Sequence, residues 1–476
     1  MRSRILARAL CAGALCLPLA AEAATDADLA DIREQIRQMK ESYEARIRAL
    51  EERLKAAEAA NATNAPAGSS TPSAPVAAAP PPTPPAPPTL PAPAGSYAAS
   101  TLSAFNPGIS VVLQGTYAHL SQDPNQFAIN AVQTSDDVGP GRRGLGLGES
   151  EITFFGNVDD KIAGNLTVSL NAQNQVEVEE AFGVLTALPY GIVPKFGRFF
   201  SGIGYLNEQH QHVWDFQDAP LVYQAYLGGQ FTQDGAQVKW VAPTDTFVEF
   251  GAEIGNGDAF PGSPRNTNGV GAGSVFVHAG DDIGDKASWR AGLSYLETHA
   301  DNRDATLPDT SDNLAKVAFT GKSRVAIADF IWKYAPTGNA QLTNVKVQGE
   351  YFWRRESGDL TYDSDGALGL TQTSNYSSSQ SGWYLQGIWQ FMPQWRVGAR
   401  YDRLNPGSPD YGANDVYLAT GDFHPERATL MFDYTPSEFS RFRVQYAESK
   451  TRPGLTDHQL FLQYILSLGA HPAHKF

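Results

Sequence analysis

The sequence is poor in cysteine and has no long apolar stretch. Its 476 residues include two cysteines, Cys11 and Cys16, and both lie among the first twenty residues. The chain beyond them has no thiol, which excludes disulfides and cysteine-ligated metal sites there. No later stretch approaches about eighteen consecutive apolar residues, so we exclude a transmembrane helix. Any membrane residence must therefore come from strands.

Basic residues are also in the minority. The 36 lysines and arginines face 51 aspartates and glutamates, which gives a net charge of −15. We expect most of this charge on loops and water-filled surfaces, where it favours solubility rather than a particular partner. No nucleic-acid partner and no cofactor are expected.

The first residues have the composition of a secretory signal. Arginines at positions 2, 4 and 8 precede an apolar run, and Ala21-Glu22-Ala23 offers small residues for cleavage. This predicts a signal peptide over residues 1–23.

Two further segments precede the region rich in predicted strands. Residues 24–60 carry apolar side chains at spacings of three and four, which predicts a coiled-coil helix; a single amphipathic helix lying on its own barrel is the alternative. Residues 61–96 hold twelve of the 31 prolines and predict a Pro/Ala-rich disordered linker. Together they suit a periplasmic stalk that contacts the cell wall or a partner, or else a tether without a target.

Residues 97–476 have the pattern of an all-β, transmembrane barrel. From about Ile109 to Leu468, short alternating apolar and polar runs are joined in turn by tight connectors and by longer polar segments. Leu166, Val168 and Leu170, for example, alternate with polar neighbours. One face of such a strand meets lipid and the other meets water.

The connectors allow the strands to be counted. Seven tight connectors and eight longer segments predict sixteen antiparallel strands, an even number that leaves an aqueous lumen. An additional strand pair within Leu221–Phe231 would make eighteen. The tight connectors are expected at 159–163, 188–192, 242–245, 281–285, 335–341, 392–394 and 435–438, and the longer segments begin near Ser121, Asn174, Ser201, Gly255, Ala300, Glu356, Asn405 and Ser449.

The third longer segment, residues 201–235, is the longest irregular piece. Loops of this length are usually functional, and its apolar residues need a wall against which to lie. We therefore expect it to fold into the lumen and to constrict the pore. Its polar residues at the constriction are His210, His212, Asp215 and Asp218.

Two short stretches carry a resemblance to a known family. One is the segment Pro194-Lys195-Phe196-Gly197-Arg198-Phe199, and the other is the closing run 463–469 with terminal Phe476. Together with the long third loop, they resemble the phosphate-selective O/P superfamily of outer-membrane porins, including relatives with an N-terminal coiled coil. The resemblance implies a homotrimeric, sixteen-stranded diffusion channel in the outer membrane of a Gram-negative bacterium. Its partners would be membrane lipid and small hydrophilic, often anionic solutes, with the N-terminal extension in the periplasm.

Alternation also predicts which charged side chains face the lumen. Five arginines on three consecutive strands form a predicted basic ladder that biases the pore toward anions; in the alternative, they neutralise neighbours such as Asp402 and Asp433. Glutamates on earlier strands form an opposing acidic wall. The predicted pore-lining residues are Arg396, Arg400, Arg427, Arg441, Arg443, Arg198, Glu249 and Glu253.

Three other functions remain open at this point. His210 and His212 are weak candidates for metal ligands in a zinc-type uptake channel, although no metal site is expected. An outer-membrane hydrolase would use a rim histidine such as His119, His278, His299 or His424, but no motif ties any of them to a nucleophile. A purely structural barrel is the third.

Overall fold

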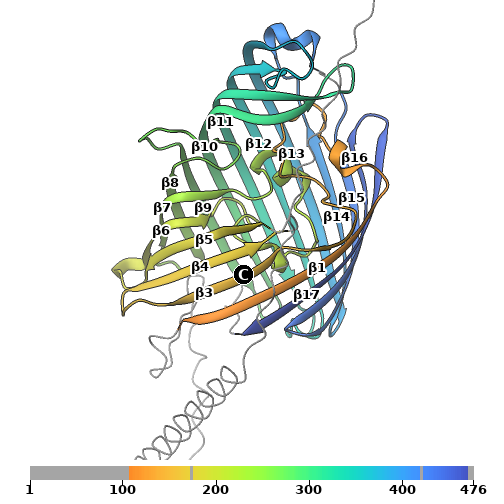
Figure 1. The fold of residues 1–476 in the computed structure, drawn as a ribbon. Helices are drawn as coiled ribbons and strands as arrows, with labels where there is room; N and C mark the ends of the chain where they lie inside the picture. Colours follow the sequence, from red (N-terminus) through yellow and green to blue (C-terminus); the bar gives the residue numbers. More distant parts are fainter. Residues whose placement is uncertain (1–106, 172–174, 419–421, 470–476) are drawn as a thin grey trace, which may run out of the picture. The chain divides into compact units, whose positions relative to one another are not determined.

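The described residues form one closed sheet. The computed structural model describes residues 107–171, 175–418 and 422–469. Their strands are all antiparallel, and β1 (Gly108–Leu120) pairs with β17 (Leu455–Gly469) to close the sheet into a barrel (Figure 1). The predicted signal peptide, coiled-coil helix and linker, and Phe476, lie outside the described residues.

The barrel has sixteen strands. Seventeen segments are hydrogen-bonded, but β2 (Gly144–Leu147) and β3 (Ser150–Asn157) both pair with β1, with the register shifted by one residue between them. They are two halves of one strand interrupted by a β-bulge. The prediction of sixteen is confirmed. Eighteen is excluded, because the helix α2 (Leu221–Leu227) occupies the segment considered for an additional pair.

The other elements follow in chain order. The strands are β4 (Ile162–Leu170), β5 (Val176–Leu185), β6 (Ile192–Phe200), β7 (Thr232–Val241), β8 (Phe247–Gly255), β9 (Ala272–Ile283), β10 (Ala287–Pro308), β11 (Leu314–Tyr334), β12 (Asn344–Tyr362), β13 (Gln372–Met392), β14 (Trp395–Asn405), β15 (Glu426–Ser437) and β16 (Ser440–Arg452). Short 3-10 helices are η1 (Pro124–Gln126), η2 (Pro189–Gly191), η3 (Gln211–Val213) and η4 (Gly412–Val416).

All seven tight connectors fall between the expected strands, but three of the longer segments begin later than predicted. The one expected near Ser449 is a two-residue turn, because β16 runs to Arg452 and β17 begins at Leu455. Strands β10 to β13 have 22, 21, 19 and 21 residues, so they run through Ala300 and Glu356 and rise above the rest of the barrel (Figure 1). Twenty residues at about 3.3 Å each far exceed a hydrocarbon layer of roughly 30 Å. Their extensions bury a second apolar cluster that includes Phe319, Leu360 and Tyr376.

The two faces of the barrel differ in polarity, as β16 illustrates. Phe442, Val444 and Tyr446 point outward and are 44 to 50% exposed, whereas Arg443 and Gln445 point inward and are buried. Trp240, Trp353 and Trp389 are among the exposed aromatic side chains on other strands. Among the described residues, no helix is long and apolar enough to cross a membrane.

The largest apolar cluster lies inside the barrel. Residues 201–231, here called the inner loop, connect β6 to β7; the predicted end at 235 is wrong because β7 begins at Thr232. All seven residues of α2 are buried. They pack in one cluster with inward side chains of the wall, including Leu296, Val325 and Phe352. The apolar residues of the inner loop thus have the wall that their burial requires.

Candidate functional site

The first turn of the inner loop is held by two buried glutamates of the wall. Glu253 on β8 accepts from Ser201 Oγ at 2.5 Å and from the Gly202 amide at 2.8 Å. Glu350 on β12 accepts from the amides of Tyr205 and Leu206, both at 3.1 Å. These bonds satisfy backbone donors that would otherwise be buried without partners.

Helix α2 is delimited by its flanking residues. Pro220 precedes it in an extended conformation, and Gly228 ends it in the left-handed region at φ +65°, where glycine is favoured. The amide of Leu221 at its start donates to Asp402 on β14 at 2.9 Å. The helix is therefore attached to the wall through its first turn as well as through its apolar side chains.

The predicted basic ladder faces inward, and three of its members clamp the inner loop. Arg400 and Arg427 contact the two carboxylate oxygens of Asp218, at 3.0 and 2.5 Å. Arg443 donates to the Trp214 carbonyl at 3.0 Å. These three side chains are at most 4% exposed. These three guanidinium groups contact the inner loop and the wall aspartates Asp402 and Asp433.

The remaining two members of the ladder reach water. Arg396 contacts Asp215 at 3.1 Å and Asp433 at 2.5 Å, and Lys346 on β12 also contacts Asp215. The Arg441 guanidinium lies 3.9 Å from Asp433. These three basic side chains are 19 to 23% exposed. In this part of the basic wall, positive charge adjoins the solvent.

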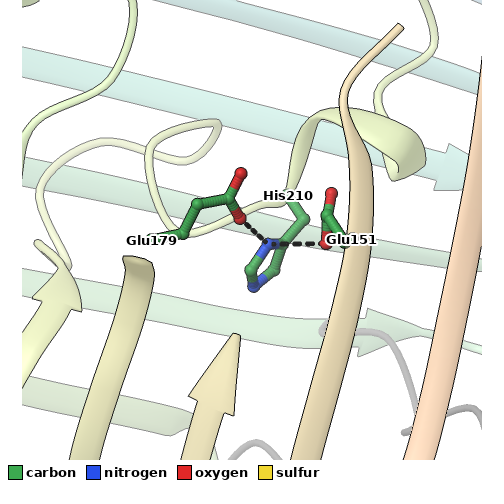
Figure 2. A group of neighbouring side chains, drawn as sticks. All are labelled: Glu151, Glu179 and His210. Atoms are coloured by element: carbon green, nitrogen blue, oxygen red, sulfur yellow. Dashed lines mark hydrogen bonds and ion pairs between the residues drawn. The ribbon is translucent and has the colours of Figure 1, made fainter. Parts of the chain in front are cut away.

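Two histidines of the inner loop contact glutamates on β3 and β5. Figure 2 shows His210 between Glu151 of β3 and Glu179 of β5. His210 Nδ1 lies 3.1 Å from Glu179 and 3.2 Å from Glu151, and its Nε2 lies 3.1 Å from Glu180. His212 Nδ1 lies 2.9 Å from Glu151. Although burial alone disfavours a charged ring, these carboxylates raise the pKa of His210 well above its usual value.

A β-bulge explains how two consecutive glutamates reach one histidine. Thr167 pairs with Glu180 and Val168 with Val178, so Glu179 is an extra residue in β5. Neighbouring strand residues normally face opposite sides, but a bulge changes the direction of a side chain. Strict alternation along the strand could not predict that Glu180 faces the lumen. The sequence also did not predict Glu350 as a residue that holds the inner loop.

The other predicted pore-lining residues have varied positions. Arg198 is on the outer face. It lies two residues from exposed Phe196 on the same strand, so both side chains point to the same side, and it contacts Asp234, its partner on the neighbouring strand β7, at 2.6 Å. Its prediction as pore-lining is therefore wrong. Glu249 and Glu253 both face inward; Glu253 is a buried loop anchor, and Glu249 contacts His278 at 3.1 Å and Lys239 at 3.4 Å. His278 therefore lies on the lumen side of β9 rather than at a rim.

Comparisons with known proteins give a relative and a set of similar folds. No family model matches the chain. A protein of Aquifex aeolicus (strain VF5), described as uncharacterized, is 28% identical over 415 residues, which is 80% of this chain and 83% of that protein.

Similar solved structures include three outer-membrane proteins. They are the loop L8 deletion mutant of OmpT of Vibrio cholerae (12% identity, 76% of this chain and 99% of that chain, TM-score 0.46), the outer membrane channel DcaP of Acinetobacter baumannii (12%, 76% and 97%, 0.45), and an anion-selective porin from Comamonas acidovorans (9%, 76% and 99%, 0.45). The barrel described above rests on the strand pairing of this chain and not on these matches.

The geometry of the site is that of a loop held across a lumen. The inner loop contacts the acidic wall through His210 and His212, and the basic wall through Asp215 and Asp218. The same loop thus contacts fixed charges of both signs. Such an arrangement can orient small charged solutes.

Proposed function

We propose that this chain is a passive outer-membrane channel for small hydrophilic solutes, with the inner loop as its constriction. The observation that carries the proposal is the reversed polarity of a closed barrel: apolar side chains are exposed outside, and charged side chains lie inside. Only a lipid environment covers such an outer face at low cost. Sixteen strands enclose more space than their own side chains fill, and the inner loop reduces that space.

We further propose a bias toward anions that depends on part of the basic wall. Arg396, Arg441 and Lys346 supply water-accessible positive charge, and guanidinium groups bind anions through several donors at once. Arg400, Arg427 and Arg443 are excluded from this role because they are buried against the loop and the wall aspartates. The ladder therefore has two functions, and solute selection belongs to the exposed members.

A homotrimer and a periplasmic location for the N-terminal extension remain part of the proposal. Cross-linking of the folded chain in membranes tests the first: bands at three times the chain mass are expected, and bands at one or two times only would contradict it.

A closed, structural barrel is the second candidate function. One observation favours it: the inner loop touches the wall at β3, β5, β8, β12 and β14 to β16, and α2 fills part of the lumen with apolar side chains. A lumen obstructed in this way would not conduct.

Planar-bilayer conductance under a salt gradient distinguishes the two. Stepwise openings with a reversal potential of anion-selective sign are expected for the channel. Insertion without conductance would contradict the channel and support the structural barrel, and openings with cation-selective sign would retain the channel but overturn the anion bias.

A further inference from the structure

The cluster around His210 has more carboxylates than its histidines can satisfy. Figure 2 shows the Nδ1 atom of His210 facing both Glu151 and Glu179. A ring nitrogen carries at most one proton, so it can donate fully to only one of the two. Glu151 in turn accepts from His212 through its other oxygen. The arrangement has more acceptors than donors.

The charge of the cluster is unbalanced in the same direction. Glu151, Glu179 and Glu180 all contact the single ring of His210. Two imidazoles, even if both are protonated, cannot neutralise three carboxylates. The side chains of Glu151 and Glu179 are only 2% and 9% exposed, and burying uncompensated charge is costly.

The spacing of the ligand atoms fits one metal ion. One atom each from Glu151, Glu179 and His210 lies within 4.8 Å of the other two. Ligands bound tetrahedrally at about 2.0–2.1 Å are roughly 3.3 Å from one another, and His210 Nδ1 lies 3.1 and 3.2 Å from the two carboxylates. His212 lies outside this group: its ring stacks on that of His210 at 5.7 Å, and its Nδ1 lies 2.9 Å from the other oxygen of Glu151.

The chemistry of the ligands selects the class of ion. Calcium and magnesium prefer sites made of oxygen atoms alone, whereas imidazole nitrogen with carboxylate oxygen suits zinc and its first-row neighbours. The His210 side chain is 23% exposed, which leaves an access route from the lumen.

We propose that Glu151, Glu179 and His210 bind one divalent first-row transition-metal ion such as Zn²⁺, with a water molecule as the fourth ligand and His212 holding Glu151 through its other oxygen. The ion joins the inner loop to β3 and β5, whereas the clamp formed by Arg400 and Arg427 joins it to β14 and β15. It is a resident structural ion, and its presence does not depend on whether the barrel conducts.

The test is a Zn²⁺ titration of the folded full-length chain in detergent after treatment with a chelator, followed by calorimetry. One tight equivalent per chain is expected. Glu179→Gln, which preserves shape and removes charge, and His210→Gln are each expected to weaken that binding at least about tenfold. Equal binding by the wild type and Glu179→Gln would overturn the site.

His278→Gln is the matched control. His278 is also an inward histidine that pairs with a glutamate, Glu249, but the proposed ligands do not include it, so Zn²⁺ affinity is expected to stay within about twofold. His471 and His474, outside the described residues, contribute the same background to every variant.

A second readout needs no variant. Co²⁺ added to the chelated wild type is expected to give the intense visible absorption of a four-coordinate site with nitrogen and oxygen ligands. If the spectrum remains that of hydrated Co²⁺, the site is overturned even if a variant fails to fold.

Discussion

Arg400 on β14 donates through Nη2 to Asp218 of the inner loop at 3.0 Å, and the same guanidinium contacts Asp402 of its own strand through Nε at 3.0 Å. Arg400 and Asp402 are almost entirely buried, and Asp218 is 11% exposed. Removing a charged group from such a position destabilises the fold mainly because its partners are left buried and unpaired. The position of the loop is therefore coupled to the stability of the barrel.

Arg400→Gln is expected to destabilise the folded chain by about 3–5 kcal/mol, because two buried carboxylates lose a partner. The looser loop should also make single-channel current noisier. Urea unfolding followed by tryptophan fluorescence measures the first effect. Arg403→Gln, on the same strand, is the control: its side chain is 43% exposed and lies 3.6 Å from Glu426, so a change within about 1 kcal/mol is expected. Equal losses in the two variants would show that Arg400 is not a clamp.

Selectivity should depend on the exposed basic residues. The double variant Arg396→Gln, Arg441→Gln removes two guanidinium groups that adjoin solvent, and it is expected to shift the reversal potential under a salt gradient toward cations. Arg198→Gln removes the same charge from the outer face and should leave the reversal potential unchanged. A double variant with the wild-type reversal potential would rule out the basic wall as the selectivity element.

Much of the fold could be predicted from local pattern, since a strand with one apolar face is specified by alternation along a few residues. The inward direction of Arg400, Arg427 and Arg443 follows from the same rule. Alternation does not reveal what those side chains touch. Pairing of Arg400 with Asp218 joins positions 182 residues apart, and it depends on how the inner loop packs.

Local irregularities account for other differences. No distinctive residue in the sequence marks the bulge that brings Glu179 and Glu180 to the same histidine. The extensions of β10 to β13 lack the apolar alternation of a membrane strand, although the backbone pairing between the strands continues. Leu360 and Tyr376 in these extensions are buried by packing above the barrel rather than by lipid. Predicted strand ends at Ala300 and Glu356 were too early for this reason.

Tyr223→Phe tests the anchor on β12. The Tyr223 hydroxyl lies 2.9 and 3.0 Å from the two oxygens of Glu350 in a buried environment, and a hydrogen bond to a charged group contributes about 1.5–3 kcal/mol. A loss of that size in urea unfolding is expected. Tyr190→Phe, at a side chain 85% exposed in η2, should change stability by less than about 0.5 kcal/mol. An unchanged unfolding midpoint in Tyr223→Phe would mean that Glu350 holds the loop without the hydroxyl.

Acid should release the inner loop through Asp215. Burial alone opposes its ionisation, but Lys346 and Arg396 lower the pKa of Asp215 to about 2 in the folded chain, against about 3.9 when unfolded. A depressed folded-state pKa contributes stability that is present above the unfolded value and is lost as the pH falls toward the folded value. The loss should therefore occur between about pH 4 and pH 2 and amount to roughly 2–3 kcal/mol.

Asp215→Asn isolates this contribution from those of other carboxylates. The variant cannot titrate at residue 215, so its urea midpoint should be lower than that of the wild type at pH 5 and should fall less between about pH 4 and pH 2. Single-channel recordings over the same range should show the wild type, but not the variant, gaining current noise as the loop loses its contacts with Lys346 and Arg396. Parallel pH profiles for the two proteins would indicate that Asp215 does not hold the loop, because a group that stabilises only as an anion must lose its effect when it is protonated.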